Sequence, residues 1–178
     1  MRILGVDPGT ICTGFGIIDY NRNVLKIVHQ GVIKPPANKT LPFKLEVIYC
    51  ELDKLIKKYS PDEFSIETAF YGKNVQSAMK IGYARGVSLL AAVHNGIPST
   101  EYSPREVKKS VVGNGAASKN QVQYMVNHIL CLNGSKMILD ESDALAVAIC
   151  HSFKLNSLTP KSRSWKDFIE ANPDRVIK

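Results

Sequence analysis

The sequence has few cysteines, and no two of them lie close together. Its four cysteines, Cys12, Cys50, Cys131 and Cys150, are scattered over 178 residues without a CxxC pair. Zinc sites and disulfide frameworks require closer or more regular spacing, so the sequence predicts neither. Free thiols in a reducing compartment are the simplest interpretation.

Long hydrophobic runs are also missing. The longest apolar stretches, residues 87–93 and 144–150, are far shorter than the ~18 residues that span a bilayer. The first residues contain no basic segment followed by an apolar core, which is the pattern of a secretory signal. We therefore expect a cytoplasmic protein without a membrane anchor.

The composition excludes disordered and collagen-like chains, because 44% of the residues are hydrophobic. There is no internal repeat. We predict one domain over residues 1–156 and a polar tail over residues 157–178, which contains Pro160 and Pro173. The 23 Lys and Arg residues exceed the 16 Asp and Glu residues, giving a formal charge of +7. Such a charge is compatible with a polyanionic partner but does not identify one.

Hydrophobic patterning predicts an α/β fold with a mixed sheet. Strands are expected at residues 2–6, 14–19, 24–33, 63–68 and 99–102, the first three as a meander. Helices are expected at residues 45–59 and 74–94, after Pro104, from Ser118 and from Asp140. Ser118 and Gln121 fit a capping box at the start of the fourth helix.

Four acidic residues stand where this fold would place a site. Asp7 ends the first strand on the face of Ile3 and Gly5, and Glu67 ends the fourth strand. Asp140 and Asp143 are three residues apart at a helix start, so both can point the same way. Carboxylates in such positions suit Mg²⁺, and two ions ~3.5–4 Å apart can support phosphodiester hydrolysis. Each acid also has a purely structural interpretation, as a helix cap, a turn residue or a partner of a lysine.

Five motifs resemble the RuvC family of bacterial Holliday junction resolvases, which belongs to the RNase H-like superfamily. They occur in the family's order over about residues 1–156: GVDPGTICTGFGIID, SIETAFYGKN, a segment with GYARGV, REVKKSVVGNGAASKNQV and DESDALAVAIC. The resemblance implies an RNase H-like fold with a mixed five-stranded sheet flanked by helices. It also implies a Mg²⁺-dependent crossover junction endonuclease in DNA recombination and repair.

The same resemblance assigns roles to individual residues. It implies a catalytic, metal-binding set of four acids that holds two Mg²⁺ ions per subunit, with Mn²⁺ as a substitute: Asp7, Glu67, Asp140 and Asp143. It implies two further catalytic residues at the cleaved phosphodiester, Lys108 and Lys119. The predicted DNA-binding residues are Phe70, Lys73, Asn74, Lys108 and Lys119. The expected partners are four-way junction DNA, a second copy of the chain and the RuvA–RuvB branch-migration complex.

Two of these features have competing interpretations from the residues themselves. Lys119 follows the predicted cap Ser118, where a helix N-terminus disfavours a cation but attracts phosphate. It is either a phosphate contact or a solvated lysine. The small residues Ala78, Gly82 and Gly86, at spacing four, form a stripe that packs either on a second copy or on the chain's own sheet.

Other interpretations remain open at this stage. His151 lies two turns beyond Asp143 on the same helix, and we expect a structural role for it. Phe70 and the adjacent Tyr71 can stack on unpaired bases, although one of the two rings is expected to belong to the core. The first motif also suits an actin-like or sugar-kinase-like ATPase, for which the chain is too short. A junction-binding module without catalysis is the third possibility.

Overall fold

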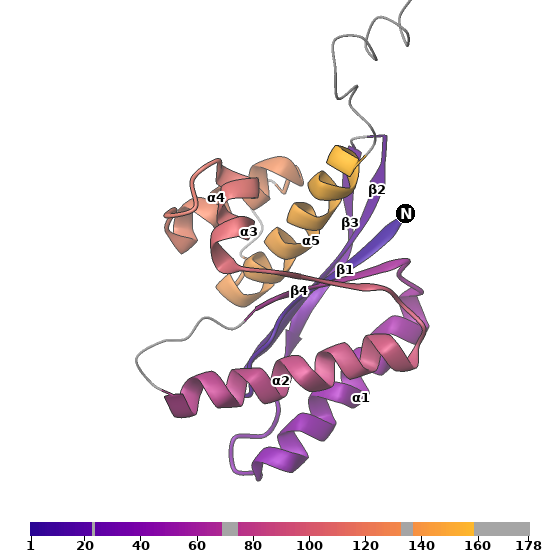
Figure 1. The fold of residues 1–178 in the computed structure, drawn as a ribbon, viewed down its shortest axis with the longest axis vertical. Helices are drawn as coiled ribbons and strands as arrows, with labels where there is room; N and C mark the ends of the chain where they lie inside the picture. The colour runs from indigo at the N-terminus through magenta and orange to yellow at the C-terminus, as the bar shows by residue number, and fades with distance from the viewer. Residues whose placement is uncertain (23, 69–74, 133–136, 159–178) are drawn as a thin grey trace, which may run out of the picture.

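The computed structural model describes residues 1–22, 24–68, 75–132 and 137–158, and it contains a five-stranded sheet with helices on both faces (Figure 1). The strands are β1 (Arg2–Asp7), β2 (Thr13–Asn21), β3 (Val24–Ile33), β4 (Glu63–Glu67) and β5 (Ser99–Tyr102). The helices are α1 (Leu41–Tyr59), α2 (Val75–His94), α3 (Pro104–Val112), α4 (Lys119–Ile129) and α5 (Leu139–Leu158). The predicted α/β class is confirmed, and every predicted element is present with small shifts at its ends.

The sheet is mixed, as predicted, with the strand order β3-β2-β1-β4-β5. The first three strands form the antiparallel meander, whereas β4 runs parallel to both β1 and β5. In the register of β1 and β4, Val6 lies opposite Ile66. Asp7 and Glu67, which follow this pair, therefore leave the sheet at the same edge.

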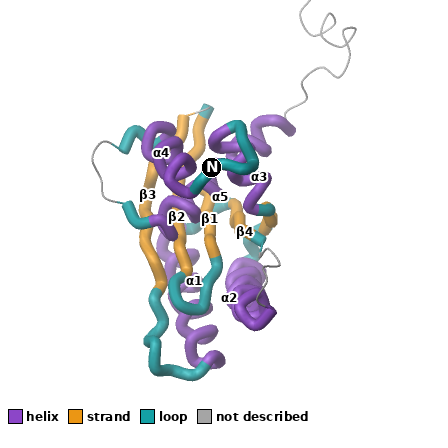
Figure 2. The backbone as a smooth tube through the Cα atoms, turned by 90° about the vertical axis from the view of Figure 1, so that its left-hand side faces the viewer, coloured by secondary structure: helices purple, strands orange, loops and turns teal. Residues whose placement is uncertain are grey.

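Alternating side chains of β1 belong to two separate cores. Ile3 packs with α3, α4 and α5, while Leu4 and Val6 pack with α1 and α2. The two helix layers lie on opposite sides of the sheet (Figures 1 and 2). Successive side chains of a strand point to opposite faces of the sheet, so β1 is buried on both faces.

Helix α5 lies unusually close to the sheet because glycines face it. A Cβ on Gly5 would overlap the backbone of Ala144, and one on Gly14 would overlap the carbonyl oxygen of Asp140. Residues 144–150 of α5 are all buried, as their apolar run predicts, between the sheet and α3 and α4. The start of α5 is thereby held directly over the end of β1, where Gly14 is paired with Asp7.

The C-terminal boundary differs slightly from the prediction. Helix α5 continues to Leu158, two residues into the segment predicted as a tail, and the rest of that segment lies outside the described residues. Across the described ranges, none of the helices combines the length and apolar character that crossing a membrane requires.

Candidate active site

A small pocket of about 150 Å³ lies where β1 and β4 end beneath α3, α4 and α5. Its polar lining comes from five residues that the sequence analysis predicts: Asp7, Glu67, Lys108, Lys119 and Asp143. Its apolar lining is Pro104, Val107, Val122 and Ala146. Five separate elements therefore bring three carboxylates and two ammonium groups to one half-buried place.

The turn after Asp7 is fixed by the buried side chain of Thr13. Its hydroxyl donates to the Gly9 carbonyl at 2.7 Å and accepts from the Gly9 N–H at 3.2 Å. These two bonds close the turn back onto the start of β2, the neighbour of β1. Asp7 consequently lies at a hydrogen-bonded corner of the sheet, where it lines the pocket.

Burial and mutual repulsion raise the pKa values of two carboxyl groups in the pocket. The pKa of Asp7 rises to about 7, first through burial and then through the charges of Asp143 and Asp140. The pKa of Glu67 rises to about 8, first through burial and then through Asp7 and Asp143. Positive charge from Lys119 partly offsets both shifts. The three carboxyl groups outnumber the two lysines of the pocket, so a bound cation would offset both the burial of these groups and their mutual repulsion.

Lys119 points toward the acids of the pocket, although 59% of its side chain is exposed to solvent. Its ammonium nitrogen lies 2.5 Å from Oδ2 of Asp143, and this bond raises the pKa of Lys119. The predicted capping box of Ser118 and Gln121 is present at the start of α4 and directs the first turn toward the pocket. The predicted phosphate contact of Lys119 would require the lysine to exchange Asp143 for the phosphate.

Asp140 and Asp143 share the first turns of α5 but do not have the same surroundings. Only Asp143 lines the pocket. Asp140 lies near the thiol of Cys12 and raises its pKa. Burial is the larger cause of this shift, and together they raise the pKa of Cys12 to about 12. Asp140 still raises the pKa of Asp7 through its charge, so it lies at the border of the same electrostatic cluster.

The carboxylates of the pocket suit a cation that takes its remaining ligands from water or from a phosphate. No three His, Cys, Asp or Glu side chains in the described ranges stand close enough together to hold a metal by themselves. Mg²⁺ commonly uses only one or two carboxylates and completes its shell with water and phosphate oxygens. The carboxyl groups of Asp7, Glu67 and Asp143 fit this pattern.

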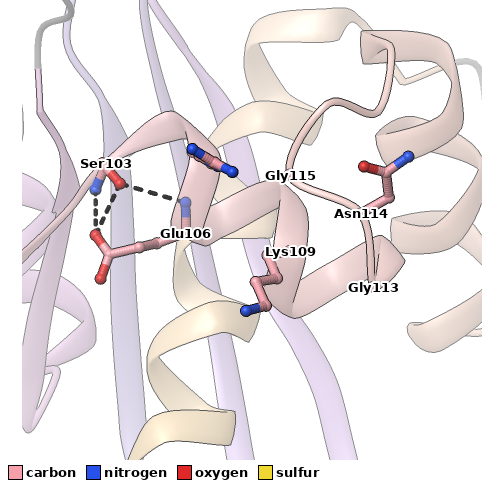
Figure 3. Close-up of a pocket in the computed structure, with 7 residues that line it drawn as sticks. Ser103, Glu106, Lys109, Gly113, Asn114 and Gly115 are labelled. Atoms are coloured by element: carbon pink, nitrogen blue, oxygen red, sulfur yellow. Dashed lines mark hydrogen bonds between the residues drawn. The ribbon is translucent and has the colours of Figure 1, made fainter.

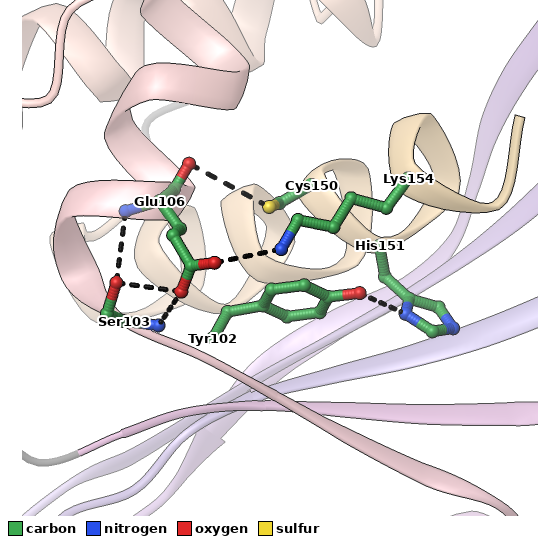
Figure 4. A network of polar contacts seen from close by, with 6 residues as sticks. All are labelled: Tyr102, Ser103, Glu106, Cys150, His151 and Lys154. Atoms are coloured by element: carbon green, nitrogen blue, oxygen red, sulfur yellow. Dashed lines mark hydrogen bonds and ion pairs between the residues drawn. The ribbon is translucent and has the colours of Figure 1, made fainter. Parts of the chain in front are cut away.

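Helix α3, which carries Lys108, is anchored by contacts that the sequence analysis missed (Figure 4). Ser103 and Glu106 form a reciprocal capping box. Glu106 also accepts from the ammonium of Lys154 on α5 at 2.9 Å, and that ammonium lies 4.5 Å from the ring centre of Tyr102. The spacing Ser-x-x-Glu after the fifth strand is the signal that could have revealed the box.

His151 has the structural role that we expected. It is buried, its Nδ1 lies 2.7 Å from the hydroxyl of Tyr102, and its Nε2 lies 3.4 Å from Oε2 of Glu63. The predicted DNA-binding residues Phe70, Lys73 and Asn74 lie outside the described residues.

Comparison with known proteins supports the predicted resemblance. The family described as "Crossover junction endodeoxyribonuclease RuvC" matches residues 3–151. The protein of that name from Chloroherpeton thalassium is 45% identical, with both chains covered completely. The one from Cytophaga hutchinsonii is 42% identical over 98% of this chain and 87% of its own.

Solved structures show the same relationship. The T. thermophilus RuvC in complex with a Holliday junction substrate matches 88% of this chain and 96% of its own. The TM-score is 0.82 at 28% identity. The shared architecture confirms the predicted RNase H-like fold.

Proposed function

Because this chain belongs to the RuvC family of crossover junction endodeoxyribonucleases, we propose that it resolves four-way DNA junctions by hydrolysing two opposed phosphodiester bonds. The observation that carries the proposal is the convergence of three carboxylates and two lysines in one pocket at the sheet edge. We place this activity in DNA recombination and repair in the cytoplasm, with the RuvA–RuvB branch-migration complex as a partner.

Mg²⁺ is the cofactor that we propose, with two ions per subunit and Mn²⁺ as a substitute. Asp7 and Glu67 would hold one ion, and Asp7 with Asp140 or Asp143 the other. When bound, such ions polarise the phosphate and lower the pKa of an attacking water. Burial and the neighbouring acids, which together raise the pKa values of Asp7 and Glu67, support this assignment, because a bound cation would offset both.

The two lysines would act on the phosphate itself. Lys108 lines the pocket from α3 and Lys119 from α4, so a phosphate between the two helices would contact both. Lys119 would release Asp143 and donate to a phosphate oxygen, which frees that carboxylate for a cation. Both ammonium groups would then stabilise the negative charge that develops during in-line attack. Phe70, Lys73 and Asn74 are proposed to contact the DNA beside the cleaved bond.

The test is cleavage of end-labelled four-way junctions, compared with plain duplexes of the same sequences. With Mg²⁺ or Mn²⁺ we expect paired nicks in two opposed strands of the junction, with ligatable ends carrying 5′-phosphate. We expect no cleavage of the junction in EDTA. We also expect no cleavage of the duplex with either metal. Tight junction binding without cleavage in either metal would contradict catalysis and favour the junction-binding module. Equal cleavage of the duplex would contradict selectivity for the junction.

The exposed face of α2 supports the proposed homodimer. Gly82 and Gly86 have open space around their Cβ positions, so they do not pack on the chain's own sheet. Exposed apolar side chains at helical spacing share this face: Val75, Met79, Tyr83, Leu90 and Val93. The opposite face buries Ala84 and Ser88 against the core. A two-fold partner would cover the apolar stripe with the same stripe.

Replacing Gly86 by glutamate is therefore expected to convert the dimer to a monomer at micromolar concentration. A charge buried between two apolar stripes lacks a partner and costs several kcal/mol. Sedimentation equilibrium measures the outcome, and paired cleavage is expected to change to slow single nicks. Lys80→Glu, an exposed change on the same helix but off the stripe, is the control and should stay dimeric. A dimeric G86E protein would place the interface elsewhere.

A further inference from the structure

A second hollow, of about 430 Å³, lies beside helix α3 and is not part of the candidate active site. Seven residues of α3, its cap and the loop before α4 line it: Ser103, Arg105, Glu106, Lys109, Gly113, Asn114 and Gly115 (Figure 3). The pocket described above uses Val107 and Lys108 of the same helix. Neighbouring positions of α3 thus face two different hollows, which we call the cleavage pocket and the α3 groove.

Two cations of the α3 groove have no acidic partner among the residues that the structure describes. Arg105 and Lys109 are one helical turn apart, so their side chains lie on the same face of α3. Both are exposed, and within the described ranges neither forms an ion pair. Arg2 and Lys119 illustrate the opposite case, because each is bonded to an aspartate.

The one carboxylate in the α3 groove is already neutralised. Glu106 is turned back toward Ser103, away from the loop of Gly113 and Gly115 (Figure 3). It accepts from the Ser103 N–H at 2.9 Å, from the Ser103 hydroxyl at 2.8 Å and from Lys154. These bonds hold the pKa of Glu106 down to about 2. The groove therefore keeps a surplus of positive charge at any pH near neutrality.

The loop side of the groove is shaped to the arginine. A Cβ on Gly115 would lie 2.6 Å from Cγ of Arg105 and 3.2 Å from its carbonyl oxygen, so only glycine leaves room for this side chain. Gly113 ends α3 with a φ of 83°, a conformation that glycine adopts without strain. The loop then returns to Arg105, and the Asn114 side chain accepts from the Ala116 N–H at 2.9 Å. The arginine stem is packed against this loop, which defines where its guanidinium can reach.

We propose that the α3 groove binds a backbone phosphate of the DNA strand, through Arg105 and Lys109, several nucleotides away from the bond that the cleavage pocket cuts. This inference rests on the proposed function. A helix with its side chains is ~10–12 Å wide, and a strand offers a phosphate every ~3.4 Å of duplex axis. The phosphate in the α3 groove is therefore a few nucleotides from the cleaved one. It positions the strand across α3 and carries no sequence preference of its own.

The test measures junction binding by the full chain in Ca²⁺, at several salt concentrations, for Arg105→Ala, Lys109→Ala and the double variant. Because the two side chains share one phosphate, the double variant is expected to lower the slope of log Kd against log salt by about one, and each single substitution by less. Lys26→Ala is the charge-matched control, since Lys26 is exposed on β3 beside Asp19, at the other end of the sheet from Asp7. It should leave the slope unchanged.

A second measurement locates the phosphate. Single methylphosphonates, which remove one charge each, are placed at successive positions on both sides of the cleaved bond. A methylphosphonate at one position, a few nucleotides away, should weaken wild-type binding about as much as the double substitution does. It should have no further effect on binding by the double variant. An unchanged salt slope in the double variant, or equal sensitivity of both proteins at every position, would overturn the inference. If the wild type binds the junction without cutting it, the proposed function fails, while this binding test still decides on the α3 groove.

Discussion

Replacing Asp7 by asparagine is expected to abolish junction cleavage, to leave junction binding intact and to stabilise the protein in the absence of metal. The carboxylate sits at the corner of the sheet, where its pKa is raised to about 7. Asparagine keeps the shape and removes the charge that would hold a cation. Losing about 4 kcal/mol of charge stabilisation in the transition state corresponds to roughly a thousandfold lower rate.

The stabilisation follows from the sign of the pKa shift. An unfolded chain releases the Asp7 proton near pH 4, whereas the folded protein holds it until about pH 7. Folding is therefore favoured by this group at low pH, and that contribution is lost as the pH rises from about 4 to 7. Glu67 acts in the same direction up to about pH 8. Without metal, the wild type should lose stability over this range, and D7N should lose less.

Urea unfolding at pH 5 and pH 8, in EDTA, measures both effects. At pH 8 the free energy of unfolding of D7N should exceed that of the wild type by about 2 kcal/mol, and at pH 5 the difference should be less than half as large. Adding Mg²⁺ should stabilise the wild type more than D7N, because a ligand stabilises the state that binds it. Cleavage by D7N at the wild-type rate, or equal stability at pH 8, would show that Asp7 is not part of a cation site.

The sequence predicted the helices and strands well, because they depend on local patterns. Apolar alternation located β1, and Asp7 at its end interrupts an apolar face. The all-round apolar run from Ala144 predicted a buried helix, which α5 is. The capping box of Ser118 predicted the first residue of α4. Each of these signals lies within a few residues of the structure that it specifies.

The surroundings of individual side chains were less predictable, because they depend on contacts between distant segments. Asp140 and Asp143 have the spacing of a shared face, yet Asp140 contacts Cys12 from the loop after β1. The bond between Lys119 and Asp143 joins two helices whose relative position no local pattern contains. The same holds for Lys154, which anchors Glu106 across 48 residues of sequence.

Alanine at Gly14 is expected to cost both stability and cleavage, because the new methyl group would meet backbone rather than a side chain. Gly14 is paired with Asp7, and its Cβ position is occupied by the carbonyl oxygen of Asp140. The first turn of α5 must therefore move away from the sheet, and Asp143 moves with it. Overpacking of this kind costs about 1–3 kcal/mol or more, and a shift of ~1 Å at a catalytic group can cost a hundredfold in rate.

Gly16→Ala is the matched control, since Gly16 lies two residues further along the same face of β2. Its Cβ would lie 2.6 Å from Cδ2 of Leu145, a side chain that can adjust more readily than a carbonyl group. G16A should lower the melting temperature by a few degrees but cleave at nearly the wild-type rate below its transition, whereas G14A should fail to cleave even where it is folded. Circular dichroism melting and single-turnover cleavage at a temperature where both variants are folded separate the two effects. If G14A cleaves as well as G16A, the close approach of α5 to β2 serves packing alone and does not set the position of the acids.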